Sequence, residues 1–263
     1  MKKLFMLAAA ALLTFGMVSC DKNDETTNND TTTTTTTGGG TDQGDDTGTD
    51  QGTDPGNANP WANPNPGTTS GEWVDLGLPS GLLWYSVNLG AAAPEHYGDY
   101  YAWGETKTKE DYSWSTYAYG SASNQLTKYC NNSEYGLDGY TDNLTTLQSS
   151  DDAATAVIGK GARIPTKDEW QELFDNTTFE WTTVNGVYGR KQTATNGNSL
   201  FLPAAGVRIY SRALGSAGDY WSASLGEDGP YHAWHVNFHY NYHCVNGYER
   251  YYGLSVRAVC PKN

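Results

Sequence analysis

Four of the five histidines in this 263-residue chain, His232, His235, His239 and His243, lie in one short segment. Their spacing of three and four residues would align them on a helix, where two imidazoles could bind zinc. However, apolar and polar residues alternate from residue 234 to 243, which is typical of a strand. On a strand, His235 and His239 are about 13 Å apart, too far to share one metal ion. The pattern favours a solvent-facing polar strand over a ligand-contacting surface, and either over a metal site.

The polar face of that strand and the loop before it are where we expect a ligand, if one binds. Residues 220–250 combine aromatic rings, which offer large contact area at small entropy cost, with side chains that form directional hydrogen bonds. The candidate ligand-binding residues are Glu227, Asp228, His235, Asn237, His239 and Asn241. We predict no metal and no cofactor among them.

Carboxylates elsewhere in the chain could support a different chemistry. Glu105, Asp151, Asp152 and Asp168 could in principle pair for glycoside hydrolysis. Asp151-Asp152 and Asp168-Glu169 are more simply explained as acids at helix starts, where the helix dipole favours them. The chain has no nucleophile elbow, Walker loop or HExxH motif. We therefore predict no catalytic residue.

Two short helices and several strands must position these side chains. Apolar runs at residues 73–76 and 82–87 flank a Pro-Ser-Gly turn and predict a strand pair. Residues 153–158 follow two aspartates and precede Gly159, which predicts a short helix. Thr166 and Glu169 have the spacing of a capping box, with Trp170, Leu173 and Phe174 forming one apolar face.

From residue 179 onward the chain is strand-like and punctuated by Asn-Gly pairs. These occur at Asn185-Gly186, Asn196-Gly197 and Asn246-Gly247, and each predicts a hairpin turn. Early strands, two helices and then hairpins predict an α+β domain of antiparallel strands.

The cysteines constrain the redox chemistry. A hairpin turning near Asn246-Gly247 would place Cys244 and Cys260 about 30 Å apart along the ladder, beyond disulfide reach. A disulfide from Cys130 to either of them stays open in an oxidising compartment.

The amino terminus predicts secretion and lipidation. Residues 1–19 combine a basic start, an apolar run too short for a comfortable transmembrane helix, and a small residue before Cys20. This arrangement resembles the lipobox of bacterial lipoproteins, which implies a diacylglyceryl group on Cys20 and a membrane anchor. We therefore expect localisation at the outer membrane or cell surface.

Residues 20–71 are dominated by Thr, Gly, Asp and Pro and show no apolar periodicity. Such a segment cannot bury enough surface to offset its ordering entropy, so we predict a disordered tether before a domain at residues 72–263. The net charge of −14 divides into +2 before residue 21, −8 in the tether and −8 in the domain. This acidic balance argues against nucleic acid as a partner, because phosphate binding needs a basic patch.

Several motifs in the domain resemble one family. They are residues 75–84 (DLGLPSGLLW), 97–106 (YGDYYAWGET), 126–130 (LTKYC), 151–154 (DDAA), 163–166 (RIPT), 169–170 (EW), 201–206 (FLPAAG), 220–224 (YWSAS) and 255–257 (SVR). Together they are similar to the Fibrobacter succinogenes major paralogous domain of Bacteroides-type lipoproteins. That family is similar in turn to the formylglycine-generating-enzyme-like branch of the C-type-lectin-like fold, so the resemblance implies this fold.

The resemblance implies little about activity, because fold does not determine function. Formylglycine-generating enzymes hold copper with paired cysteines, and the domain has no such pair. Calcium-dependent lectins use carboxylate and amide motifs that residues 226–230 and 233–237 lack. We therefore expect a non-enzymatic module that binds a glycan or a surface protein. The alternatives are an enzyme of the formylglycine-generating type and a structural subunit of a surface fibre.

Overall fold

The computed structural model describes residues 69–159, 161–209, 212–214 and 217–262. The predicted signal peptide, Cys20 and the predicted tether up to residue 68 lie outside these residues. Within them, none of the helices has the length and apolar character needed to cross a membrane.

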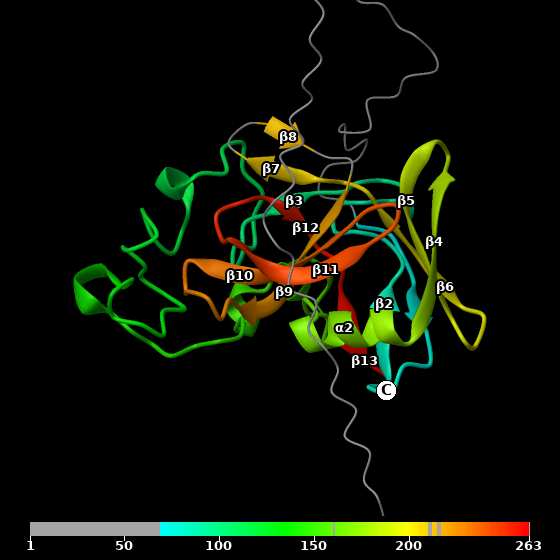
Figure 1. Ribbon diagram of the computed structural model, residues 1–263, viewed down its shortest axis with the longest axis horizontal. Helices are drawn as coiled ribbons and strands as arrows, with labels where there is room; N and C mark the ends of the chain where they lie inside the picture. Colours follow the sequence, from blue (N-terminus) through cyan, green and yellow to red (C-terminus); the bar gives the residue numbers. More distant parts are fainter. Residues whose placement is uncertain (1–68, 160, 210–211, 215–216, 263) are drawn as a thin grey trace, which may run out of the picture.

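A mixed five-stranded sheet forms the centre of the domain (Figure 1). Its strand order is β11-β10-β9-β12-β3, with bounds His243–Glu249, His232–Phe238, Gly218–Leu225, Leu254–Ser255 and Tyr100–Tyr101. All neighbours are antiparallel except β12 and β9.

Three smaller sheets surround this centre. One pairs β1 (Trp73–Asp75), β2 (Leu82–Tyr85) and β13 (Val259–Pro261); another pairs β4 (Thr177–Val184), β5 (Val187–Ala194) and β6 (Ser199–Pro203); the third pairs β7 (Val207–Ile209) and β8 (Arg212–Leu214). In Figure 1 the β4-β5-β6 sheet stands to the right of the central sheet, and the long connection after β3 extends to the left.

Two α-helices form where the sequence predicts them. Asp152 caps α1 (Ala153–Ile158), and its carboxylate accepts from the backbone N–H groups of Thr155 at 2.9 Å and Ile164 at 2.8 Å. The predicted capping box of Thr166 and Glu169 begins α2 (Lys167–Asp175). Short 3₁₀ turns lie at Trp114–Thr116, Leu137–Gly139 and Ser149–Asp151. Mostly antiparallel sheets with two helices confirm the α+β class.

The central sheet is covered on both faces. Val236 and Phe238 of β10 pack with the apolar face of α2 on one side. Ala233 of the same strand packs with Trp221 and Leu254 in a second cluster. Because both faces of β10 meet a core, the neighbouring side chains of His235 and Val236, which point to opposite faces, are both buried.

Two arginines are built into the interior and are fully hydrogen-bonded. Arg257 donates to the Asn88 side-chain oxygen and to the carbonyls of Tyr85 and Phe201, over 2.7–3.0 Å. Arg250 donates to three backbone carbonyls and to the Tyr117 hydroxyl, over 2.6–3.1 Å. Each guanidinium thereby joins chain segments that are distant in sequence, and these bonds offset the cost of burying the charge.

Two of the three predicted Asn-Gly hairpins are confirmed, and the third is wrong. Asn185-Gly186 joins β4 to β5, and Asn196-Gly197 lies between β5 and β6. By contrast, Asn246 and Gly247 pair with β10 in the middle of β11. The turn lies at residues 239–242, where the His239 N–H donates to the Tyr242 carbonyl at 3.0 Å. Long-range pairing with β10 overrides the local turn preference.

Candidate functional site

An open groove of about 640 Å³ lies between the β4–β5 hairpin and the end of β10. We call it the aromatic groove, because four of the ten residues that line it carry aromatic rings. The lining residues are Tyr97, Trp181, Gly186, Val187, Tyr188, Ala204, Ala217, Asn237, His239 and Tyr240. This size is in the range of sites for small organic ligands.

The two-residue Asn185-Gly186 turn positions the aromatic wall. Both turn residues have positive φ (49° and 83°), as a type I′ hairpin requires. The turn fixes the register that pairs Trp181 with Arg190 and Thr183 with Tyr188. Trp181 and Tyr188 then project from one face of the hairpin and stack, with ring centroids 6.1 Å apart and planes inclined by 13°.

The opposite wall is polar and comes from the β10–β11 hairpin. The Asn237 amide donates to Asp219 Oδ1 at 2.8 Å, so its orientation is fixed by the neighbouring strand β9. His239 packs edge-on against Tyr242, with ring centroids 4.4 Å apart. The groove therefore combines a flat aromatic surface with hydrogen-bonding groups held by their neighbours.

Exposed aromatic area is concentrated around this groove. Tyr188 and Tyr240 are 60% and 65% exposed, the highest values among the large hydrophobic side chains of the described residues. Phe179 and Tyr242, on the same two hairpins, are also exposed. An apolar surface with a polar border is a common mark of a binding site.

His235 does not lie on a solvent-facing strand surface, so that prediction is wrong. Its side chain is 3% exposed, stacked on Tyr248 with planes inclined by 17°. Its Nδ1 lies 3.1 Å from the Asn246 carbonyl, and its Nε2 lies 3.6 Å from Asp219 Oδ1. The alternation of β10 is real, but the second core cluster covers the face that we expected to be exposed.

The six candidate residues do not form one surface. Only Asn237 and His239 line the aromatic groove, and Asn241 is exposed in the adjacent turn. Glu227 and Asp228 lie in the loop before β10, about 20 Å from the groove end at the rise of a strand. There Glu227 forms an ion pair with Lys167, and Asp228 contacts His232 Nδ1 at 3.0 Å.

Of the four carboxylates considered for glycoside hydrolysis, three have structural partners, and Asp168 is exposed in the first turn of α2. Asp151 accepts from the Lys128 ammonium and the Tyr129 hydroxyl, each at 2.5 Å. Asp152 caps α1, and burial raises the pKa of its carboxyl group. Glu105 accepts from Lys109 Nζ at 2.9 Å. The helix-start interpretation is therefore confirmed for Asp152.

The cysteines of the domain are buried. Cys130, Cys244 and Cys260 form no disulfide. Burial also raises the pKa of the Cys260 thiol, which lowers the thiolate fraction that reacts or binds soft metals. Among the described residues, no group of three or more His, Cys, Asp or Glu side chains is arranged to hold a metal ion.

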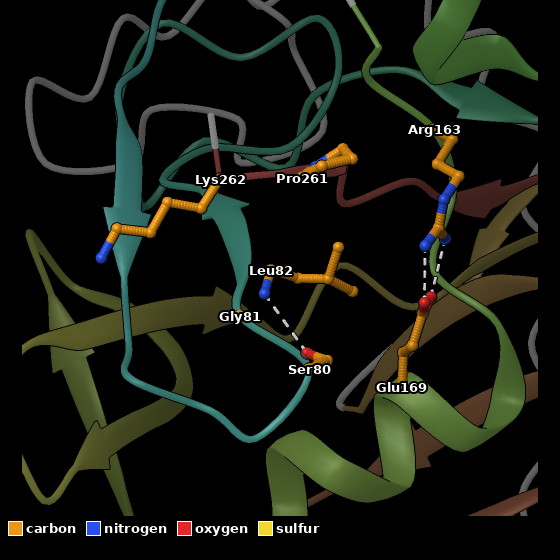
Figure 2. A pocket seen from close by; sticks show the side chains of 7 residues that line it. All are labelled: Ser80, Gly81, Leu82, Arg163, Glu169, Pro261 and Lys262. Carbon is orange, nitrogen blue, oxygen red and sulfur yellow. Dashed lines mark hydrogen bonds and ion pairs between the residues drawn. The ribbon is translucent and has the colours of Figure 1, made fainter.

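A second open pocket, of about 620 Å³, lies beside the carboxyl end of the domain (Figure 2). Its charged groups already pair within the protein. Arg163 donates to both carboxylate oxygens of Glu169, at 2.7 and 2.5 Å, and Lys262 Nζ lies 2.6 Å from Asp75. Although burial opposes it, the hydrogen bonds from Arg163 hold the pKa of Glu169 below its usual range. This pocket offers no aromatic ring and is a weaker candidate.

Comparisons of the chain with protein-family models, with curated proteins and with solved structures give no match. The aromatic groove is therefore identified as the candidate site by its geometry alone.

Sequence reasoning missed the aromatic wall of this groove. The signal was present, because a two-residue turn at Asn185-Gly186 fixes which residues of the two strands share a face. That register places Trp181 and Tyr188 on the same face. What the sequence does not give is the approach of this hairpin to the end of β10, which depends on tertiary packing.

Proposed function

We propose that this protein is a surface-anchored, non-enzymatic lipoprotein whose domain binds a saccharide in the aromatic groove. The observation that carries the proposal is the stacked pair of nearly parallel rings, Trp181 and Tyr188, beside the amide of Asn237. The C–H faces of a sugar ring pack well on flat aromatic surfaces, and its hydroxyls need fixed donors and acceptors. The groove offers both.

The family resemblance supports the same proposal from a different direction. A C-type-lectin-like fold on a Cys20-anchored tether would carry the groove outside the cell, where glycans and surface proteins are the accessible partners. The burial of Cys130, Cys244 and Cys260 favours a binding module over a copper-dependent oxidase.

Binding to a glycan array, followed by titration calorimetry with the best ligand, tests the groove. Trp181→Ala should weaken binding by about 2 kcal/mol, or roughly thirty-fold, as expected for a central aromatic contact. Tyr140→Ala, which removes an exposed aromatic ring outside the groove, is the control and should bind normally. Equal binding by the wild-type protein and Trp181→Ala would show that the site lies elsewhere. Capture of a protein rather than any glycan would contradict the saccharide assignment.

Anchoring is tested separately with Cys20→Ala. This change should release the protein from the membrane fraction or stall removal of the signal peptide, because no thiol remains for lipidation. A variant that is processed normally and stays membrane-bound would contradict the anchor.

A further inference from the structure

Arg190, on β5, is the buried arginine for which the fold supplies too few hydrogen-bond acceptors. Its side chain is 1% exposed, yet Nε and Nη1 have no hydrogen-bond acceptor among the described residues. No carboxylate of these residues forms an ion pair with it either. Burial lowers its pKa to about 10, so the guanidinium remains charged at neutral pH.

Aromatic rings are the contacts that Arg190 does make. Its guanidinium carbon lies 3.6 Å from the ring centroid of Phe179 and 5.1 Å from that of Phe174. Such contacts contribute about 0.5–2 kcal/mol. They do not accept in-plane N–H groups, and each buried donor without an acceptor costs about 1–3 kcal/mol. The neighbour on the same strand face, Gln192, contacts the Thr177 hydroxyl at 2.8 Å through its side-chain oxygen.

Arg190 also lies next to the aromatic groove. It is the direct cross-strand partner of Trp181, and Tyr188 is two residues away on the same face of β5. Phe179, which covers the guanidinium, is 43% exposed and two residues from Trp181 on β4. Because Arg190 is buried and does not itself line the groove, contact with a ligand there would require this exposed ring to rotate.

A carboxylate is the group that best supplies the acceptors and the negative charge that Arg190 lacks. Its two oxygens accept a pair of parallel N–H groups from a planar guanidinium, and such charge-assisted bonds are about twice as strong as neutral ones. We propose that Arg190 binds the carboxylate of an acidic sugar whose ring packs on Trp181 and Tyr188. This inference rests on the proposed function and narrows the ligand class to carboxylate-bearing saccharides.

The test uses sodium glucuronate and glucose as probes on the full chain, with binding followed by the shift of the unfolding temperature. Glucuronate should stabilise the wild-type protein more than glucose does. Arg190→Met should lose this preference, with at least a ten-fold weaker affinity for glucuronate. Lys191→Met removes the same charge from the adjacent, exposed position and should keep the preference.

The outcomes separate this inference from the proposed function. Failure of glucuronate to bind, or equal binding by Arg190→Met and the wild-type protein, overturns the role of Arg190. If glucose binds as tightly as glucuronate and Trp181→Ala abolishes the binding of both, the role of Arg190 is overturned, but the groove remains the binding site. Tighter binding of inorganic sulfate or of a glutamate-rich peptide overturns the assignment to an acidic sugar.

A second measurement covers the case in which Arg190→Met does not fold. The Nε–H resonance of Arg190 in the wild-type protein should shift on titration with glucuronate and not with glucose. An unchanged resonance overturns the inference.

Discussion

Arg257 and Arg190 are both almost completely buried, but the protein treats their charges differently. Arg257 donates four hydrogen bonds and connects β2, β6 and the loop after β2. Arg190 packs between two phenylalanine rings and keeps two nitrogens without an acceptor. The first arrangement stabilises the fold, whereas the second costs stability.

The difference extends to the regions around the two residues. Near Arg257, the buried Asn88 amide donates to the Tyr97 carbonyl and to the Tyr220 hydroxyl. The β4–β5 hairpin instead exposes Phe179 and Tyr188 and buries Arg190 with two nitrogens that lack an acceptor. Proteins keep such costly features where a ligand compensates for them, and they often lose stability in exchange for function. The contrast separates a buried arginine that holds the domain together, Arg257, from one that serves the groove, Arg190.

The largest effect is expected for Arg257→Met. The change leaves the acceptors of Asn88, Tyr85 and Phe201 buried without a donor, so the free energy of unfolding should fall by about 3–5 kcal/mol. Urea unfolding followed by tryptophan fluorescence measures this loss. A loss below about 1 kcal/mol would show that the interior adapts easily to the change. The hydrogen bonds of Arg257 would then not distinguish it from Arg190.

A smaller loss is expected for Asp152→Ala at the start of α1. Two backbone N–H groups would lose their acceptor, at a cost of about 1–2 kcal/mol. Asp168→Ala, which removes an exposed carboxylate from the first turn of α2, should change stability by less than about 0.5 kcal/mol. Equal effects of the two changes, in the same urea assay, would contradict a special role for the buried cap.

Tyr188→Ala should cost less stability than Asp152→Ala, about 0.5 kcal/mol, because the ring is 60% exposed. The same change should weaken saccharide binding several-fold, since half of the stacked pair is lost. Parallel unfolding and calorimetric titrations separate the two effects. A stability loss above about 2 kcal/mol would identify Tyr188 as part of the fold rather than of the site.

The smallest expected effect concerns pH. Burial, and then the positive charge of Arg190, lower the pKa of His243, while Asp175 opposes the shift. Because the unfolded chain then takes up the proton first, this residue removes stability as the pH falls below about 6.5. His243→Gln should therefore reduce the loss of stability between pH 7 and pH 5.5. An unchanged pH profile would show that His243 titrates as it does in the unfolded chain.

The α+β class, both helices, their caps and two hairpins could be predicted because local signals determine them. The cap of Asp152 on Thr155, the capping box of Thr166 and the Asn185-Gly186 turn each involve residues close together in the chain. The position of the third hairpin turn and the burial of His235 could not be predicted. They depend on the pairing of β10 with β11 and on coverage by the second core cluster, which involve distant segments. The sequence pointed to Asn237 and His239, and both line the groove. Its aromatic wall could not be predicted, because the position of that wall depends on tertiary packing.

The most direct test of the comparison is the free energy of unfolding of Arg190→Met, measured without ligand beside Arg257→Met. We expect Arg190→Met to be at least as stable as the wild-type protein, because methionine fills similar volume without burying a charged group that lacks acceptors. A loss of about 3 kcal/mol or more, similar to that of Arg257→Met, would show that Arg190 serves the fold and would contradict its role in ligand binding.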